Sequence, residues 1–292
     1  MDDRKPRSAG GTRFANRSEC FGSTQAGVRI SIITAVYNGM PCLEEAINSV
    51  LAQGSSEVEH VVIDGGSTDG TVDLLDRYSD RIAYWHSRSD SGIYDAWNSG
   101  LAEAKGEWIA FLGADDRLCN GAIEAYLSYI EENELRKWDL ISSKSQRLSP
   151  DQRSFSISGR EWAWPEFSKH MCIAHPAALH HRRLFQRFGG FDTSYRICGD
   201  YEFLLRAGSS LRAGFLDRVT AICKAGGVSE TARAPIEAAR AKYRTGGRAL
   251  LLCWVECFYF LLRSAINSTR LGPWIRELRL ALNGDKGDVG RM

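Results

Sequence analysis

The stretch VVIDGGSTDG at residues 61–70 decides the fold class of this 292-residue chain. Its branched apolar residues stop at Asp64, as expected of a buried strand, and the two glycines that follow can take backbone angles that other residues avoid. Ser67 and Asp69 belong to the residue types that cap the start of a helix. The stretch therefore predicts a strand, a tight turn and a helix, which is the repeating unit of an α/β sheet.

The same alternation continues on both sides of this stretch. Strands are predicted at residues 29–36, 58–64, 82–86, 108–112 and 139–143, and helices at residues 41–53, 71–78, 93–104 and 121–132. Apolar strands interleaved with amphipathic helices predict an α/β fold with a mostly parallel, twisted sheet and helices on both faces. Residues 155–227 are less periodic and predict a smaller second layer.

Composition and motifs exclude several classes of protein. Hydrophobic content of 43% and charged content of 25% describe an ordinary globular chain, and a formal net charge of +1 gives no reason to expect a nucleic-acid partner. The chain contains no GxxxxGK(S/T) motif and no strand-coupled GxGxxG motif. Their absence argues against a P-loop NTPase and against a dinucleotide dehydrogenase.

The N-terminus and the cysteines indicate a cytoplasmic protein. Residues 1–27 are rich in Gly, Ser and Arg and contain no apolar run, so they predict a disordered tail and not a signal peptide or a membrane span. The eight cysteines are scattered and form no CxxC pair, which favours free thiols in a reducing compartment over a disulfide framework.

Carboxylates mark three successive strand ends or the loops beyond them: Asp64, the segment SDSGIYDAWNSG at 89–100, and ADD at 114–116. In an open α/β sheet this edge is where ligands bind. Asp115 and Asp116 repel one another unless a cation or hydrogen bonds neutralise them, and a Mg²⁺ ion bridged to a diphosphate would do so. The sequence therefore predicts an enzyme that handles a nucleotide-diphosphate compound.

These segments, together with SIITAVYN at residues 31–38, resemble the family 2 glycosyltransferases with the GT-A fold, and in particular the bacterial exopolysaccharide and cell-envelope transferases of the colanic-acid type. The resemblance continues in a His-Pro pair, a GGFD turn, a GDYEFLLR helix start and a GGVS loop, at residues 175–176, 189–192, 199–206 and 226–229. It implies a catalytic domain at 28–229, with a nucleotide-sugar half at 28–145 and an acceptor half at 146–229, and a C-terminal helical segment at 230–292.

The resemblance implies a binding site for a nucleotide-diphosphate sugar. The residues that it assigns to this site are Thr34, Val36, Tyr37, Asn38, Asp64, Asp95 and Asp115. Asp64 would contact the base and Asp95 the sugar and diphosphate, whereas the residues alone also allow a turn role for Asp64 and a helix-cap role for Asp95. Asp116 is the expected ligand of Mg²⁺ or Mn²⁺, with Asp115 on the ribose or on a water of the metal shell. Ala114 stands where the family's DxD motif has its first Asp.

Transfer with inversion requires a base that takes the acceptor hydroxyl proton on the face opposite the departing nucleotide. The resemblance implies that Asp200 is this base, that Glu202 is its reserve and that His175 lies on the acceptor side. From the residues alone, Asp200 could instead cap the helix that follows it, and His175 could be structural.

The sequence thus predicts an inverting glycosyltransferase that moves a sugar from a nucleotide-diphosphate donor to a saccharide or lipid-linked acceptor, in polysaccharide or cell-envelope biosynthesis. A sugar nucleotidyltransferase and a catalytically silent nucleotide-sugar binding module are the alternatives. The nucleotidyltransferase shares a parallel sheet and metal carboxylates, but it normally begins with a Gly-rich phosphate loop that the segment ITAVYNG at 33–39 lacks.

Residues 249–262 are strongly apolar and aromatic, but Glu256 interrupts them and Arg263 ends them, so the segment is too short and too charged to span a membrane. Basic residues flank it at Lys242, Arg244, Arg248, Arg270, Arg276 and Arg279. One interpretation is an interfacial helix that attaches the protein to the inner face of the cytoplasmic membrane, near a lipid-linked acceptor. The other is a helix docked on the catalytic domain or in a dimer interface.

Overall fold

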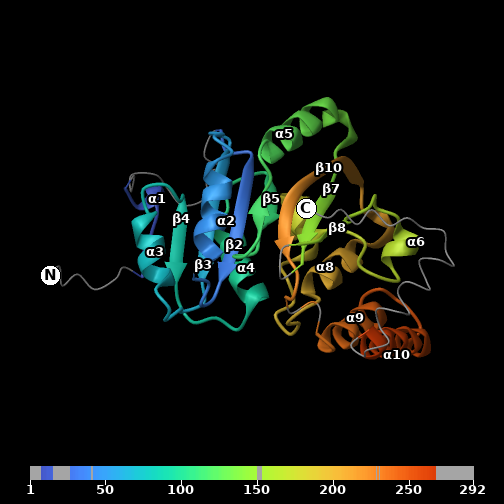
Figure 1. Cartoon of the computed structure of the whole chain (residues 1–292). Coiled ribbons are helices and arrows are strands. Elements are labelled where there is room, and N and C mark those ends of the chain that lie inside the picture. Colours follow the sequence, from blue (N-terminus) through green and yellow to red (C-terminus); the bar gives the residue numbers. More distant parts are fainter. Residues whose placement is uncertain are drawn as a thin grey trace.

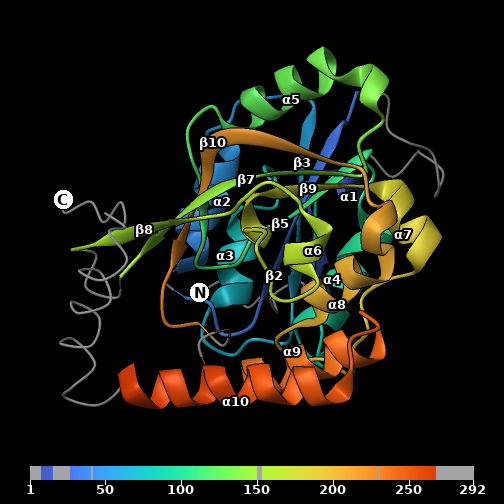
Figure 2. The ribbon, with the colours of Figure 1, turned by 90° about the vertical axis from the view of Figure 1, so that its right-hand side faces the viewer.

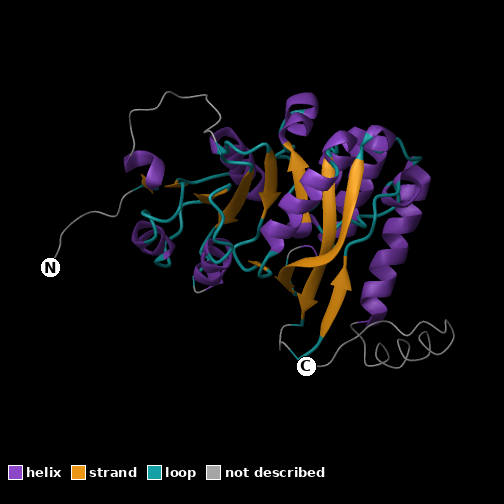
Figure 3. Ribbon diagram, turned by 90° about the horizontal axis from the view of Figure 1, so that it is seen from above, coloured by secondary structure: helices purple, strands orange, loops and turns teal. Residues whose placement is uncertain are grey.

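The computed structural model describes residues 8–15, 27–40, 42–149, 153–227, 229 and 231–267. Its centre is one ten-stranded sheet, with helices on either side of it (Figures 1 and 3). The strands are β1 (Ala9–Gly10), β2 (Ile30–Val36), β3 (Val58–Asp64), β4 (Tyr84–Ser87), β5 (Trp108–Phe111), β6 (Arg117–Leu118), β7 (Leu140–Leu148), β8 (Phe155–Ser158), β9 (Ala178–His181) and β10 (Ala213–Lys224). Their order is β1-β4-β3-β2-β5-β9-β7-β10-β6, and β8 pairs with β7.

The helices alternate with the strands along the first half of the chain. They are α1 (Thr12–Ala15), α2 (Cys42–Leu51), α3 (Thr71–Arg77), α4 (Ile93–Glu103), α5 (Ala122–Glu132), α6 (Trp164–Phe167), α7 (Arg182–Phe188), α8 (Gly199–Ala207), α9 (Arg233–Arg244) and α10 (Leu250–Asn267). Short 3₁₀ turns lie at Glu134–Arg136, His175–Ala177 and Gly208–Ser210.

Strands β4, β3, β2 and β5 form the parallel part of the sheet. In β3, Val61 and Ile63 pack on the face covered by α4, and Val62 packs on the face covered by α2 and α3. All three side chains are at most 1% exposed. A continuous apolar strand is what burial on both faces requires, so the α/β architecture predicted from the sequence is confirmed.

The second half of the sheet is more regular than the sequence predicted, and it is mixed. β9 runs antiparallel to both β5 and β7, whereas β10 runs parallel to β7. The twelve-residue β10 was hidden because the charged pair Asp217 and Arg218 interrupts its apolar pattern. The ladder shifts register there, between Leu216 and Val219, as at a β-bulge.

Part of the predicted N-terminal tail is ordered. Residues 8–15 add the short strand β1 to the edge strand β4, and the helix α1 follows it. Gly10 lies against the Trp85 indole, where a Cβ would come within 2.6 Å of Nε1, and Arg13 forms an ion pair with the buried Glu59. These tertiary contacts overcome a composition that locally favours disorder. Residues 1–7 and 16–26 of the tail lie outside the described residues.

At the other end of the chain, α10 docks on α9, which separates it from the sheet (Figure 2). Cys253 and Cys257 are buried against Ala239 of α9. Glu256 also faces inward, 2.5 Å from the ammonium of Lys242, a side chain that is only 4% exposed, and it pairs with Arg248. Two of the predicted flanking basic residues therefore already share one carboxylate within the chain, which offsets one of their two positive charges. Three others, Arg270, Arg276 and Arg279, lie outside the described residues.

The opposite face of α10 is apolar and exposed. Its exposed side chains are Leu250, Leu251, Leu252, Trp254, Val255, Phe258, Tyr259, Phe260 and Leu262. Within the described part of the chain, no helix has the length and apolar character needed to cross a membrane. The seven cysteines among the described residues are free thiols, and Cys20 lies outside them.

Candidate functional site

The loops that follow β2 and β3 are tied together by side-chain-to-backbone hydrogen bonds. The amide of Asn38 donates to Ser67 Oγ at 2.7 Å, and the amide of Thr68 donates to Asn38 Oδ1 at 2.9 Å. Met40 donates its amide to Asp69 Oδ2 at 2.9 Å. Asn38 has a φ of 50°, a left-handed conformation in which Asn is enriched among non-glycine residues. The two loops therefore form one continuous rim at the carboxyl ends of the strands.

Asp64 is completely buried at the end of β3 and organises this rim. Its carboxylate accepts hydrogen bonds from the amides of Gly66 and Ser67, at 3.1 and 2.9 Å, and from the hydroxyl of Ser67. It also accepts a hydrogen bond of 2.6 Å from Ser87 Oγ at the end of β4. This donor set gives Asp64 the turn role that the sequence left open beside contact with the base.

The four residues expected to floor the donor site differ in exposure. Thr34 is completely buried, with its hydroxyl 3.0 Å from His60 Nε2, and Val36 is 5% exposed within the core. Tyr37 is 68% exposed, and Asn38 is exposed in the rim. Of these four, only Tyr37 and Asn38 have exposed side chains at this strand end, whereas Thr34 and Val36 are buried.

The loop between β4 and α4 packs on the same rim. A Cβ at Gly65 would lie 2.8 Å from Asp90 Oδ2, so this loop and the turn after β3 are in close contact. Asp95, in the first turn of α4, accepts hydrogen bonds of 2.9 Å from both the amide and the hydroxyl of Ser91, and these bonds lower the pKa of its carboxyl group. Asp95 thus binds the loop residue that precedes the first turn of α4, in keeping with the helix-cap alternative.

Asp115 and Asp116 flank the backbone of Gly113 just beyond β5. A Cβ at Gly113 would lie 2.7 Å from Asp116 Oδ2 and 3.1 Å from Asp115 Oδ1. Asp115 is exposed, whereas Asp116 is 9% exposed. Burial, with a smaller effect of the neighbouring Asp115 charge, raises the pKa of Asp116 to about 6.

Two residues that the sequence did not assign to the site contact Asp116, and a third contacts one of them. The Cys223 thiol and the backbone N–H of Lys224, at the end of β10, donate to the Asp116 carboxylate. The Lys224 ammonium lies 3.2 Å from Cys42 Sγ at the start of α2. The signal that could have located them is the GGVS loop, since it directly follows Lys224 and Ala225.

The carboxylate pair fits a metal that is held jointly with the substrate. Among the described residues, no group of three or more His, Cys, Asp or Glu side chains forms a protein-only metal site. Mg²⁺ is commonly bound by one or two carboxylates together with substrate phosphates and water, and Mn²⁺ has a similar preference for oxygen. Asp115 and Asp116 supply the two carboxylates, and the raised pKa of Asp116 is the electrostatic cost that a cation would relieve.

Asp200 lies in the first turn of α8 and contacts α4 across the molecule. Tyr94 donates its hydroxyl to the carbonyl of Ile197 at 2.7 Å, and the same oxygen is 3.2 Å from Asp200 Oδ1. Gly199 permits this approach, because a Cβ there would be 2.7 Å from the Tyr94 ring. Burial raises the pKa of Asp200 to about 6. The Asp200 carboxylate is half-buried and lies next to the first turn of α4, which carries Tyr94 and Asp95.

Glu202 has a different environment from Asp200. It is 5% exposed, forms an ion pair of 2.5 Å with Arg206 and accepts a hydrogen bond of 2.9 Å from Thr245 Oγ1. Arg206 also donates hydrogen bonds to the carbonyls of Phe188 and Gly190, at 2.9 and 2.7 Å. Glu202 therefore ties α8 to the GGFD turn and to the end of α9.

His175 lies in an aromatic cluster formed by side chains of α4, β5 and the GGFD turn. Its ring stacks on Trp97 and Phe111, with centroid distances of 5.1 and 5.4 Å. It is 6% exposed, and burial lowers its pKa to about 3. This packing gives His175 contacts within the core and keeps the imidazole neutral, and its place on the acceptor side stays a prediction.

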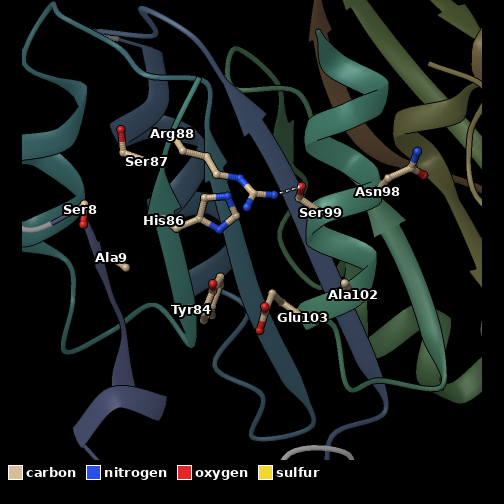
Figure 4. Close-up of a pocket in the computed structure, with 10 residues that line it drawn as sticks. All are labelled: Ser8, Ala9, Tyr84, His86, Ser87, Arg88, Asn98, Ser99, Ala102 and Glu103. Carbon is tan, nitrogen blue, oxygen red and sulfur yellow. Dashed lines mark hydrogen bonds between the residues drawn. The ribbon is translucent and has the colours of Figure 1, made fainter. Parts of the chain in front are cut away.

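A pocket of about 620 Å³ lies along β4 and α4 (Figure 4). Arg88 crosses it to donate a hydrogen bond of 2.9 Å to Ser99 Oγ. Its lining consists of Ser8, Ala9, Tyr84, His86, Ser87, Arg88, Asn98, Ser99, Ala102 and Glu103. None of the site residues predicted from the sequence is among them, although one lining residue, Ser87, donates a hydrogen bond to Asp64.

Comparison with solved structures finds chains of similar fold. The Staphylococcus aureus TarS fragment 1–349, in complex with UDP-GlcNAc, matches with a TM-score of 0.57 and 16% sequence identity over 89% of this chain and 77% of that chain. The mannosyltransferase PcManGT from Pyrobaculum calidifontis, in complex with GDP-Man and Mn²⁺, matches with a TM-score of 0.55 and 18% identity, over 94% of this chain and 86% of that chain. The fold is therefore of the GT-A type.

Sequence relatives give the family. An uncharacterized glycosyltransferase of Mycobacterium tuberculosis is 33% identical over 61% of this chain and 68% of its own length. A PGL/p-HBAD biosynthesis glycosyltransferase of Mycobacterium bovis BCG is 30% identical over 63% of this chain and 72% of its own length. The model of glycosyl transferase family 2 matches residues 31–186, which are more than half of the chain. With its motifs in order on a GT-A sheet, this chain belongs to glycosyl transferase family 2.

Proposed function

We propose that this enzyme transfers a sugar, with inversion, from a nucleotide-diphosphate donor to a saccharide or lipid-linked acceptor in polysaccharide or cell-envelope biosynthesis. The observation that carries the proposal is the half-buried carboxylate of Asp200, with its pKa raised to about 6, beside the helix start that carries Tyr94 and Asp95. A carboxylate with this pKa is largely ionised at neutral pH and remains basic enough to accept a proton.

In the proposed reaction, Asp200 takes the proton of the acceptor hydroxyl. The acceptor oxygen forms a bond to the anomeric carbon of the donor, and the bond from that carbon to the diphosphate oxygen breaks. Its electron pair leaves with the nucleoside diphosphate. Attack and departure on opposite faces of the sugar invert the anomeric centre. Glu202 is not the proposed base, because its carboxylate is occupied by Arg206 and Thr245.

The donor is proposed to lie over the rim at the ends of β2, β3 and β4. Tyr37 offers an exposed ring for the base, and Asn38 and Asp95 offer polar groups nearby. Asp116, with Asp115, would hold Mg²⁺ or Mn²⁺, which when bound supplies positive charge to the leaving diphosphate. The UDP-GlcNAc and GDP-Man complexes of the two structural relatives support a nucleotide sugar as the donor class.

Family membership favours glycosyl transfer over synthesis of a sugar nucleotide. A silent binding module would keep the donor site and lack turnover, so turnover separates it from an enzyme. The test begins with a thermal-shift panel of UDP-GlcNAc, UDP-glucose, UDP-galactose and GDP-mannose, with and without Mn²⁺, because ligand binding stabilises the folded state by mass action. Turnover of the donor that stabilises the protein is then measured as release of its nucleoside diphosphate. A protein that binds a donor and never releases nucleoside diphosphate, with any acceptor or with water, contradicts the proposal.

We further propose that the exposed face of α10 attaches this enzyme to the inner face of the cytoplasmic membrane. Trp254, Phe258 and Tyr259 on this face are 47% to 68% exposed, and aromatic side chains are favoured at a membrane–water interface. Glu256 offsets one of the two positive charges of Lys242 and Arg248, so we propose that burial of the apolar face of α10 supplies most of the driving force among the described residues.

A further inference from the structure

Three consecutive backbone amides converge on one carboxylate just before α8. Glu237 of α9 accepts hydrogen bonds at Oε2 from the N–H groups of Arg196, Ile197 and Cys198, at 3.1, 2.8 and 3.0 Å. Its Oε1 lies 3.1 Å from the Arg196 amide. Successive N–H groups that point to one place form an anion-binding concavity. Here a side chain of the same protein fills that concavity.

Helix α9 is fastened along the segment that leads to Asp200. Arg240 donates hydrogen bonds to the carbonyl and the hydroxyl of Ser194, at 3.3 and 2.7 Å, and its guanidinium stacks 4.4 Å over the Tyr195 ring. Cys198 Sγ lies 3.4 Å from the carbonyl of Ala234. These contacts fasten α9 to residues 194–198 at points other than the Glu237 carboxylate.

The peptide units around Ile197 are fixed from two sides. Glu237 holds the N–H of Ile197, and Tyr94 donates to its carbonyl. Gly199 then lies against the Tyr94 ring without room for a Cβ, and Asp200 follows it. The backbone from which Asp200 projects is therefore held both by Tyr94 and by Glu237.

We propose that Glu237 is a positioning residue, which holds the 196–198 backbone so that Asp200 stands where it accepts the proton of the acceptor hydroxyl. The inference rests on the proposed function, because it takes Asp200 to be the base. It assigns a task in the reaction to α9, a helix that follows the residues matched by the family model.

The charge of Glu237 gives a second way to detect this role. Among the described residues, no Lys, Arg or His side chain forms an ion pair with Glu237, so its charge is balanced by amide dipoles alone. The titratable groups that face Asp200 are Tyr94 of α4, Cys198 of its own loop and Glu237 of α9. Glu237 raises the pKa of Asp200 by repulsion, whereas the hydrogen bond from Tyr94 lowers it.

The experiment compares Glu237→Ala and Glu237→Gln with Arg240→Gln, one helical turn further along α9. Hydrogen–deuterium exchange measures the protection of the amides of residues 196–198. Turnover is measured as release of nucleoside diphosphate from the donor selected in the thermal-shift panel, with water as acceptor. In Glu237→Ala the amides should exchange at least about tenfold faster, since charge-assisted hydrogen bonds are lost. Its kcat should fall about tenfold, with the donor KM within about twofold. Glu237→Gln, which retains one acceptor oxygen, should lie between Glu237→Ala and the wild type.

The pH profile separates positioning from a general loss of structure. In Glu237→Gln the acidic limb of kcat should move to lower pH, because the repelling charge is gone, whereas Arg240→Gln should leave the limb in place. Faster amide exchange in Glu237→Ala with unchanged kcat overturns the inference and leaves the proposed function intact. An equal loss of kcat in Arg240→Gln has the same consequence. Unchanged kcat in Asp200→Asn, or no nucleotide release by the wild type with water or with any acceptor, shows instead that the proposed function fails, and the inference fails with it.

Discussion

The hydroxyl of Tyr94 lies 3.2 Å from Asp200 Oδ1 and donates to the carbonyl of Ile197 at 2.7 Å. Through this one side chain, the helix that begins beside the donor rim is joined to the helix that carries the proposed base. The contact joins α4, which carries Asp95, to α8, which carries Asp200.

Tyr94→Phe should change the pH dependence of turnover with little loss of stability. The ring and its contacts with Trp97 and Phe191 remain, and only the hydroxyl is lost. Since that hydroxyl lowers the pKa of Asp200, the acidic limb of kcat should move to higher pH, opposite to the shift expected for Glu237→Gln. A pH profile of nucleoside diphosphate release measures this. An unmoved limb would separate Tyr94 from the titration of Asp200.

Asp200→Asn should remove chemistry and spare donor binding. The amide preserves shape and polarity but cannot accept the proton, so kcat should fall by roughly 10²–10⁴-fold with the donor-induced thermal shift retained. Glu202→Gln is the matched control, and it should lower the melting temperature, since it weakens the buried pair with Arg206. A large loss of kcat in Glu202→Gln, with Asp200→Asn nearly active, would reverse the assignment.

Asp116→Asn should abolish the stimulation of donor binding by Mn²⁺ without unfolding the protein. The amide is isosteric with the carboxyl group, and removal of a buried like charge beside Asp115 offsets the loss of a charged acceptor. Thermal shift with the donor, with and without Mn²⁺, measures the effect, and Asp73→Asn on the exposed surface of α3 is the control. Full activity in EDTA, or normal Mn²⁺ stimulation in Asp116→Asn, would refute metal binding at this position.

His175→Phe should make the protein more resistant to acid. An unfolded histidine binds a proton below its ordinary pKa of 6.5, whereas folded His175 binds one only near pH 3, so stability is lost as pH falls through this window. Between pH 6 and pH 4, the variant should lose less free energy of unfolding than the wild type, by about 1.4 kcal/mol per pH unit. Urea unfolding at several pH values measures the slope.

The same variant, His175→Phe, tests the acceptor side, because a changed dependence of turnover on acceptor concentration would give His175 a role there.

Trp254→Ser combined with Phe258→Ser should release the protein from anionic vesicles. Both side chains are exposed on α10, whereas its inward contacts through Cys253, Glu256 and Cys257 are untouched. Burial of an aromatic side chain is worth about 1.5–3 kcal/mol, so affinity should fall by tenfold or more.

Leu135→Ser is the matched control for this double variant. Leu135 is an exposed apolar residue of the turn after α5, and α5 lies on the opposite side of the molecule from α10 (Figure 2). Truncation before Arg248 is less informative, because it would leave the buried Lys242 without Glu256. If the double substitution does not change vesicle binding, the exposed face of α10 serves some contact other than the membrane.

The sequence alone was enough to determine the parallel half of the sheet. The strand predicted at 58–64 has those bounds in the structure, and the helices predicted at 71–78 and 93–104 each end within one residue of the observed element. These elements were predictable because burial on both faces, turn glycines and cap residues are local features of sequence. Their local order also places the carboxylates at the strand ends.

Tertiary structure decided what each polar side chain does. Asp200 and Glu202 are two positions apart on one helix, yet one contacts Tyr94, 106 residues away, and the other is neutralised by Arg206 and Thr245. The hydrogen bonds of Glu237 to the loop before α8 could not be predicted either. Burial, pKa and hydrogen-bond partners depend on residues that are distant in the chain, and no local pattern of hydrophobicity records which distant groups the fold brings together.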